Sequence, residues 1–432
     1  MPDATHPLDK LVAILKRSDI ESPCYLYDGD GAQSAVCDLT DTLEKHLGAN
    51  TRVFLPVFAN PCFPLLDLLV ASAPGVGVLV NSLPELAAVR AFPWHVTPIV
   101  LFAGGVLTPA DVSRVCTMAD FYYATSWANL RTALAMDNRK ATIGLRIDIS
   151  NSGELRGIPV QDIPHLLSQQ PAIATQVAAI HAYQGPDSPG FDACLTHADA
   201  LLSLTGWFPE LRQVNFSGGW PFDYLETSTP LPSRRQPLRH YLSHLCAKIP
   251  LADFCSDPVE IAFEPGKFLL AAYGYFFCRV IEESRTAPYQ SDIHLDASFV
   301  HLPSLKLKNR QHAVSLFDHE WKIADNPGIS CQLRGYSGLS TDFLMPGRVI
   351  LPKPRSGDYL VVHDVGVYGW AGSYNFLGLQ RPPEYVRIGD QVQLVRHRQR
   401  EGYPLEGLIP LEFSAYRQTA VPHGDLDQRG SM

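Results

Sequence analysis

Short apolar runs alternate with helix-like runs between residues 51 and 275, and this alternation constrains the fold more than any other feature of the chain. The strand-like runs lie at 51–57, 76–80, 99–103, 121–124, 142–147, 177–182, 213–216 and 258–263. Apolar residues recur at helical spacing between them, at 64–71, 84–91, 109–118, 128–136, 164–169, 191–204 and 238–248. Strands that alternate with helices form a parallel sheet. The count of eight strands predicts an α/β fold, a (β/α)8 TIM-type barrel. The pattern alone leaves a doubly wound open sheet as the alternative.

The residue pattern of the sequence changes after residue 276. Turn-forming residues become frequent, as in Asn326-Pro327-Gly328 and Met345-Pro346-Gly347. Runs of β-forming residues at 275–281, 349–351, 359–363 and 391–396 lie among the turns. This pattern predicts a second, mainly β domain, with a loop at 309–325 and a frayed tail at 422–432.

Charge and apolar run length exclude several classes of partner. The net charge is −9, from 35 basic and 44 acidic residues, and no Lys/Arg run occurs, so neither nucleic acid nor an anionic membrane is expected to bind. Apolar runs such as 99–103 are far shorter than the ~20 residues that cross a bilayer. The first 20 residues lack the apolar core of a signal peptide. The nine cysteines form no CxxC pair, so we expect reduced thiols, a cytoplasmic protein and no metal site.

Chemically informative residues follow four of the predicted strands. Arg146 closes the fifth strand and His181 closes the sixth. Ser217-Gly218-Gly219 follows the seventh, and Glu264-Pro265-Gly266-Lys267 follows the eighth. In a (β/α)8 barrel, the C-terminal ends of the strands and the loops after them carry the chemistry. Each residue alone has an ordinary structural explanation, but their joint order predicts one site at this end of the barrel.

Five segments, taken in order, resemble the motifs of one enzyme superfamily. The segments are 23–28, 54–61, 81–86, 156–159 and 357–368. Together they resemble the fold-type III pyridoxal-phosphate (PLP) enzymes, the alanine racemase and diaminopimelate–ornithine decarboxylase superfamily. The resemblance implies a PLP-binding-type barrel at 41–275, a decarboxylase-like β domain at 276–432 and an N-terminal segment, 1–40, that packs with the β domain. It also implies a small-molecule ligand and a dimer, formed with itself or with a homologous decarboxylase.

The resemblance assigns a phosphate site to residues near the barrel mouth. Backbone N–H groups of Ser217, Gly218, Gly219 and Gly266 would converge on the phosphate, joined by the Tyr368 hydroxyl. Glycines after a barrel strand permit this close approach of backbone to an anion.

The resemblance also assigns residues to the cofactor ring. His181 would stack on the ring, and Glu264 would accept a hydrogen bond from the pyridinium nitrogen, which keeps the ring an electron sink. Arg146 would orient this part of the site. Lys267 stands where the superfamily has the arginine of Glu-Pro-Gly-Arg, and we expect it to contact the phosphate.

Four departures from the superfamily pattern fall on chemical positions. Phe58 stands at the position of the lysine that forms the Schiff base with PLP, and a phenyl ring cannot form an imine. Leu79 stands at the position of an aspartate in the ornithine decarboxylases. In Gly335-Tyr336-Ser337-Gly338-Leu339, Gly338 stands for the cysteine that protonates the carbanion and Leu339 for the acid that contacts the substrate. The resemblance therefore implies no confident catalytic residue and a loss of Schiff-base catalysis.

Three functions remain open from the sequence. The first is a decarboxylase-derived protein that no longer decarboxylates, binds PLP or a related phosphorylated ligand non-covalently, and acts as a partner or regulatory subunit. The second is an enzyme with altered chemistry in specialised amino-acid or natural-product metabolism. The third is a working amino-acid decarboxylase that uses Lys267 in place of the missing lysine.

Overall fold

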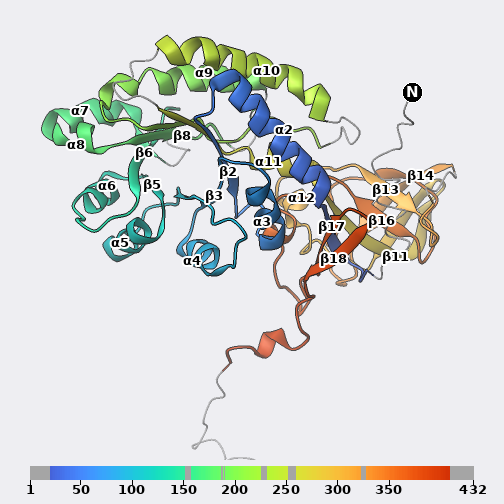
Figure 1. The fold of residues 1–432 in the computed structure, drawn as a ribbon. Coiled ribbons are helices and arrows are strands. Elements are labelled where there is room, and N and C mark those ends of the chain that lie inside the picture. The colour runs from blue at the N-terminus through green and yellow to red at the C-terminus, as the bar shows by residue number, and fades with distance from the viewer. Residues whose placement is uncertain are drawn as a thin grey trace, which may run out of the picture.

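The computed structural model describes residues 20–150, 157–185, 188, 190–224, 231–251, 259–322 and 327–408. Figure 1 shows two bodies: a barrel wrapped by helices and, beside it, a domain built mainly of strands. The expected 422–432 tail and Arg156 of the 156–159 segment lie outside the described residues. The predicted combination of a (β/α)8 barrel and a mainly β domain is confirmed.

The barrel is a closed ring of eight parallel strands. In ring order these are β5(Phe121–Ala124), β4(Val100–Phe102), β3(Val76–Val80), β2(Thr51–Pro56), β10(Glu260–Phe263), β9(Gln213–Asn215), β8(Ala179–Ala182) and β6(Thr142–Asp148). Pairing of β5 with β6 closes the ring, and β7(Ile158–Pro159) adds a short extension to β6. Alternate residues of barrel strands point inward, and Phe54, Leu101 and Tyr123 form part of an apolar cluster drawn from separate strands.

Helices follow the barrel strands and cover their outer side (Figure 1). They are α3(Phe63–Ser72), α4(Leu83–Ala91), α5(Pro109–Met118), α6(Trp127–Leu134), α7(Ile163–Gln169), α8(Ala172–Gln176), α9(Phe191–Leu202), α10(Leu231–Lys248) and α11(Gly266–Leu270). Several begin with a side-chain cap, which satisfies an N–H group that the first turn leaves unpaired. The hydroxyl of Ser82 accepts from the Glu85 N–H at 3.3 Å, and Thr108 and Ser126 cap α5 and α6 in the same way.

The second domain is built on a sheet whose strands come from segments that are far apart in sequence. Its strands are β1(Cys24–Asp28), β11(Gly274–Ala287), β12(Gln290–Leu295), β13(Val314–Phe317), β14(Gly328–Arg334), β15(Val349–Pro352), β16(Tyr359–Val362), β17(Glu384–Ile388) and β18(Gln391–Arg396), with α12(Pro303–Leu307) beside them. β1 pairs antiparallel with β11 and parallel with β17. The first described strand of the chain therefore belongs to this sheet.

One expectation about local structure is wrong, and one helix was not predicted. The segment 309–325 was expected to be a loop, but it contains β13, which pairs with β16 from Val314 opposite Val362; pairing with a distant strand supplies the order that the local sequence does not show. α2(Gly29–Leu47) was not predicted as a helix. It packs on α3 and α10 of the barrel, and the expected boundary at residue 40 falls inside it.

Two hydrogen bonds join the barrel to the second domain beside the predicted site. The Asn60 side chain, just after β2, donates to the Gly366 carbonyl at 2.8 Å. The Tyr368 N–H donates to the Ala59 carbonyl at 2.7 Å. These bonds hold the loop after β2 against the loop that contains Gly366 and Tyr368. Phe58 directly precedes Ala59 in the first of these loops. The mouth of the barrel on this side is shaped by both domains.

Buried histidines of the second domain make the stability depend on pH. Burial lowers the pKa of His312 to about 4, from an ordinary value of 6.5, and its Nδ1 pairs with the His363 carbonyl at 2.7 Å. Above pH 6.5 the ring is neutral in both the folded and the unfolded chain, so it has no effect on stability. As pH falls from 6.5 toward 4, the unfolded chain takes up a proton that the folded chain does not, and stability is lost.

We expect the wild-type chain to lose about 2.5 kcal/mol of unfolding free energy through His312 between pH 7 and pH 4.5. His312→Asn keeps a donor near the His363 carbonyl but does not titrate. Urea unfolding of both proteins at the two pH values should therefore show a smaller pH-dependent loss in the variant. Equal losses in the two proteins would contradict the assignment.

Candidate functional site

A cavity of about 160 Å³ lies at the C-terminal end of the barrel. Its lining residues lie on or just after six of the eight barrel strands, with one contribution from the second domain: Pro56, Phe58, Leu79, Asn81, Arg146, Tyr183, Gly218, Gly219, Glu264, Gly266, Lys267 and Tyr368. An enclosed cavity of ~150 Å³ accommodates a benzene ring. The space therefore suits one six-membered ring, with the rest of a ligand extending toward the opening.

The structure brings most of the residues predicted from sequence into this one cavity. The members that line it are Arg146, Gly218, Gly219, Glu264, Gly266, Lys267 and Tyr368. His181 and Ser217 are fully buried and do not appear among the lining residues. Gly338 and Leu339 lie elsewhere, beside a separate hollow in the second domain that also includes Tyr336. The roles assigned to these residues by resemblance stay predictions.

Glycines at the polar end of the cavity let neighbouring backbone segments pack closely against one another. A Cβ atom on Gly218 would lie 2.0 Å from the Glu264 carbonyl oxygen. Gly219 has a φ of +77°, and its Cβ would lie 2.2 Å from the Gly185 carbonyl oxygen. Gly266 packs against Pro56, which its Cβ would meet at 2.8 Å. These loops fit together only with glycine, and their backbones form the rim of the polar end.

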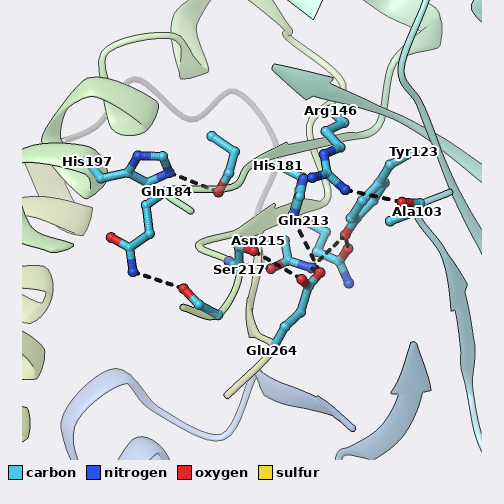
Figure 2. A network of polar contacts seen from close by, with 12 residues as sticks. Ala103, Tyr123, Arg146, His181, Gln184, His197, Gln213, Asn215, Ser217 and Glu264 are labelled. Atoms are coloured by element: carbon cyan, nitrogen blue, oxygen red, sulfur yellow. Dashed lines mark hydrogen bonds and ion pairs between the residues drawn. The ribbon is translucent and has the colours of Figure 1, made fainter. Parts of the chain in front are cut away.

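Glu264 is held as an anion at the cavity floor (Figure 2). Its Oε1 accepts from the Asn215 amide at 2.9 Å, and its Oε2 accepts from the Ser217 hydroxyl at 3.0 Å. Burial acts to raise its pKa, but His181, Arg146 and the Ser217 hydroxyl outweigh burial, so the pKa lies below its usual range. Each carboxylate oxygen retains room for a further donor, so Glu264 can receive an N–H group from a ligand.

His181 lies beneath the cavity and not in its wall. Its ring stacks on Tyr123, with centroids 5.2 Å apart and an interplanar angle of 27°. Its Nε2 is 3.4 Å from Glu264 Oε1. Burial lowers the pKa of His181, and the adjacent Glu264 opposes that effect only in part. A ring in the cavity can stack on His181 only if neighbouring side chains move.

A chain of hydrogen bonds continues from Glu264 to the opposite end of the barrel. Asn215 lies 3.3 Å from the Tyr123 hydroxyl, which donates to Gln213. Gln213 in turn donates to Glu260, whose carboxylate pairs with Arg52 at 2.6 Å. The side-chain oxygen of Asn215, Oδ1, accepts from the Ser217 N–H at 2.7 Å, which fixes the orientation of the side-chain amide. Because each donor in this series has a defined acceptor, the hydrogen bonds hold Asn215 in the orientation in which its side-chain amide donates to Glu264.

Space for Tyr123 comes from small residues on neighbouring strands. A Cβ atom on Gly144 would lie 2.6 Å from the Tyr123 ring and 2.8 Å from Cβ of Ala179. Gly144 pairs directly with Tyr123 in the ladder between β5 and β6. The tyrosine ring therefore crosses the barrel interior, where it supports His181 from below.

Arg146 forms one side of the cavity. Its guanidinium donates to the Ala103 carbonyl at 3.2 Å and lies 5.3 Å from the centre of the Tyr183 ring. Burial lowers its pKa, and the charge of Glu264 works against that shift. The arginine stays charged and lies on the same floor as Glu264.

The opposite side of the cavity is apolar. Pro56 ends β2 and pairs in register with Leu79 of β3, and Phe58 follows β2 in the adjoining turn. All three line the cavity, and Phe58 also packs on the apolar cluster inside the barrel. This wall offers hydrocarbon and no group that reacts with a carbonyl.

Two lysines approach the site from different elements. Lys267 is 9% exposed and is the one lysine among the described lining residues. Lys308, from the loop after α12, places its Nζ 5.0 Å from the centre of the Tyr368 ring. Lys308 could not be assigned to the site from the sequence, because its position depends on the packing of the second domain against the barrel.

Four further residues of the site were not identified from the sequence as functional. Asn81 and Tyr183 line the cavity, while Tyr123 and Asn215 support its floor. A signal was present for each: all four lie at or just beyond the C-terminal ends of barrel strands. Among the described residues there is no cluster of three His, Cys, Asp or Glu side chains suited to a metal ion, and no described helix is long and apolar enough to span a membrane.

Comparisons with known proteins point to one group of enzymes. No protein-family model matches the chain. Diaminopimelate decarboxylase of Deinococcus radiodurans is 24% identical over 407 residues, which cover 88% of this chain and 93% of that enzyme. The diaminopimelate decarboxylase of Escherichia coli K12 is 26% identical over 267 residues, which cover 60% of this chain and 61% of that enzyme.

Solved structures with the same fold carry related names. A crystal structure of a diaminopimelate decarboxylase superposes with a TM-score of 0.77 at 20% identity, covering 94% of this chain and 97% of that one. The M. jannaschii enzyme in complex with L-lysine gives 0.77 at 18% identity, covering 92% and 94%. The arginine decarboxylase of Paramecium bursaria Chlorella virus, bound to agmatine, gives 0.72 at 17% identity, covering 88% and 100%. The chain thus has the fold of these decarboxylases, and its sequence is distantly similar to those of diaminopimelate decarboxylases.

Proposed function

We propose that this chain is a decarboxylase-derived protein that binds PLP or a related phosphorylated ligand without a covalent bond and does not decarboxylate amino acids. The observation that carries the proposal is the composition of one cavity. Its polar end keeps Gly218, Gly219 and Glu264, while Phe58 and Leu79 form its apolar wall. The residues that would hold a phosphorylated ring are together, whereas the position assigned to the Schiff-base lysine is occupied by a phenyl ring.

The residues present fit PLP in kind. When bound in an enzyme, PLP supplies an electron sink for carbanion chemistry. In this chain, Gly218 and Gly219 line the polar end of the cavity, where Lys267 adds a positive charge. The N–H groups of Gly266 and Ser217 already donate to the Glu264 carbonyl at 2.9 Å and to the Asn215 side-chain oxygen at 2.7 Å. Glu264, held anionic by Asn215 and Ser217, can accept from a protonated ring nitrogen. These residues would bind and orient the ligand. None of them lies at the position of the missing Schiff-base lysine, which Phe58 occupies.

A titration of the wild-type protein with PLP tests this proposal. We expect saturable binding with a dissociation constant in the micromolar range, about 10 µM, and competition by inorganic phosphate. Lys267→Met should weaken binding about tenfold, because a charge-assisted contact to the phosphate contributes about 1.5 kcal/mol. Lys322→Met, which changes an exposed lysine whose ammonium group pairs with Glu320, is the matched control. Absence of saturable binding would overturn the proposal.

The alternative in which Lys267 forms the Schiff base has one observation in its favour, the position of Lys267 in the cavity lining. Its place beside Gly266, at the polar end, favours a phosphate contact instead. The two assignments differ in the fate of PLP on borohydride treatment, since only an imine is trapped.

A partner subunit, identical or homologous, is the second part of the proposal. Tyr374 and Phe376 are exposed and lie with Phe299 in one aromatic group, with ring centroids 6.3 Å and 6.4 Å from that of Phe299. Exposed apolar groups of this kind mark interaction surfaces. Sedimentation of the purified chain should show a dimer that Phe376→Glu dissociates, whereas Leu405→Glu, an exposed position outside the group, should not. A wild-type monomer that also fails to bind a homologous decarboxylase would contradict this part.

A further inference from the structure

Polar side chains form a column through an interior of the barrel that is otherwise largely apolar. β9 and β10 supply most of it, because alternate residues of a barrel strand point inward and Gln213 pairs in register with Glu260. Asn215 follows Gln213 by two residues and Glu264 follows Glu260 by four, so both point inward as well. The members of this polar column are Arg52, Glu260, Gln213, Tyr123, Asn215 and Glu264 (Figure 2).

A buried column of this kind costs free energy unless its groups are paired. Tyr123, Gln213 and Asn215 are at most 1% exposed, and the side chains of Arg52 and Glu260 are 18% and 15% exposed. Apolar side chains of similar size would fill the same space without burying polar groups. The chain instead keeps a connected series of hydrogen bonds. What the column holds in place therefore explains it better than stability does.

The carboxylate of Glu260 sets the direction of the hydrogen bonds in the polar column. A carboxylate only accepts, so Gln213 turns its amide nitrogen toward Glu260 and donates to it. The amide oxygen of Gln213 then faces Tyr123, whose hydroxyl donates to it. The lone pairs of the Tyr123 oxygen are left for the side-chain nitrogen of Asn215, 3.3 Å away. One charge at the N-terminal end of the barrel thus fixes each donor in turn.

Asn215 depends on this direction to hold Glu264. Its side-chain nitrogen donates to Glu264 Oε1 at 2.9 Å, and its second hydrogen faces Tyr123. If the Gln213 amide were turned over, the Tyr123 hydroxyl would lose its acceptor and its proton would compete with the Asn215 hydrogen for the same space. The Ser217 N–H, at 2.7 Å from the Asn215 oxygen, would then hold the amide alone. A reversed Gln213 therefore disturbs the donor that orients Glu264.

We propose that Glu260 is a positioning residue for Glu264, at the opposite end of the barrel, and that it acts through the polar column without touching a ligand. Arg52 holds Glu260 for this role: its Nε and Nη2 donate to Oε2 at 2.8 Å and 2.6 Å, which leaves Oε1 for Gln213. The column transmits an orientation, and no proton moves along it. The inference rests on the proposed function, in which Glu264 accepts from the ring nitrogen of a phosphorylated ligand.

Two variants interrupt the polar column at different points. Glu260→Leu removes the acceptor that orients Gln213. Tyr123→Phe removes the hydroxyl but keeps the ring that stacks on His181, so it stays informative if Glu260→Leu does not fold. The probes for the full-length protein are PLP and benzyl phosphate, which has a ring and a phosphate but no ring nitrogen. We expect each variant to weaken PLP binding about fivefold, the ratio that one hydrogen bond supplies, and to leave benzyl phosphate within about twofold of wild type.

A double variant and a control separate positioning from a general loss of structure. Glu260→Leu combined with Tyr123→Phe should weaken PLP binding no more than either change alone, because both act through Asn215. Asp120→Leu is the matched control. Asp120 directly precedes β5 at the same end of the barrel and pairs with Arg90 at 3.0 Å, outside the polar column. This variant should leave both affinities within about twofold of wild type.

The outcomes distinguish this inference from the proposed function. If the column variants weaken PLP and benzyl phosphate equally, or if their effects add in the double variant, Glu260 does not position Glu264 and the inference is overturned while the proposed function stands. If wild type binds benzyl phosphate as tightly as PLP, Glu264 does not receive the ring nitrogen and the inference is overturned as well. If wild type binds neither probe, the proposed function fails and the inference fails with it.

Discussion

Replacing Phe58 by lysine should produce a protein that captures PLP covalently. Phe58 lines the cavity just beyond β2 and is partly buried, so an amine at this position can reach a ring held between the glycine loops and Glu264. We expect Phe58→Lys to develop a visible absorbance band with PLP that borohydride abolishes. We also expect PLP affinity to rise at least tenfold, since imine formation adds to the existing contacts.

Phe58→Met is the matched control for this result. It removes the ring but adds no amine, so it reports how much of any change comes from lost packing. Neither variant should turn over diaminopimelate to lysine, because Gly338 and Leu339 stand at the positions that the resemblance assigns to the proton donor and to the acid that contacts the substrate. If Phe58→Lys is folded and binds PLP, yet no reducible adduct forms, the assignment of Phe58 to the lysine position is wrong.

The second large effect is expected at Gly218. A methyl group there would lie 2.0 Å from the Glu264 carbonyl oxygen. The backbone fixes the positions of both atoms, so no side-chain rotation relieves the overlap. The two loops are also tied by a hydrogen bond from the Glu264 N–H to the Ser217 carbonyl at 2.8 Å. We expect Gly218→Ala to lower the free energy of unfolding by about 3 kcal/mol, measured by urea unfolding, and to abolish phosphate-dependent ligand binding.

Gly105→Ala is the control for Gly218→Ala. Gly105 also follows a barrel strand, β4, but a Cβ atom there meets nothing within 4 Å. Its unfolding free energy should stay within about 0.5 kcal/mol of wild type. Similar losses in both variants would show that the close approach of Gly218 to Glu264 is not what constrains the site.

The barrel could be predicted from the sequence because its strands are buried on both sides and its helices begin at local signals. Runs such as Val76–Val80 are continuously apolar, as the strands of a parallel sheet are. Ser82 and Thr108 precede proline at the first helical turn, which fixes where α4 and α5 begin. The missed helix α2 had a weaker signal, because its buried stripe begins with small residues, Ala32 and Ala35.

The site could be predicted in part, for a physical reason. Residues at the C-terminal ends of parallel strands converge whatever the details of packing, so Arg146, Glu264 and the glycine loops were found from order alone. The burial of His181 was not, because it depends on Tyr123, whose ring lies over Gly144 on the next strand. Contacts across the domain junction, such as Lys308 over Tyr368, likewise arise only from tertiary packing.

The most direct test of the account is the intact mass of the wild-type protein after treatment with PLP and borohydride. We expect saturable PLP binding and an unchanged protein mass, because the wall of Phe58 and Leu79 offers no amine. Digestion and mass mapping should then show every lysine of the cavity region, Lys267 and Lys308 included, unmodified. A stoichiometric mass gain of one pyridoxyl phosphate on Lys267 or Lys308 would contradict the account.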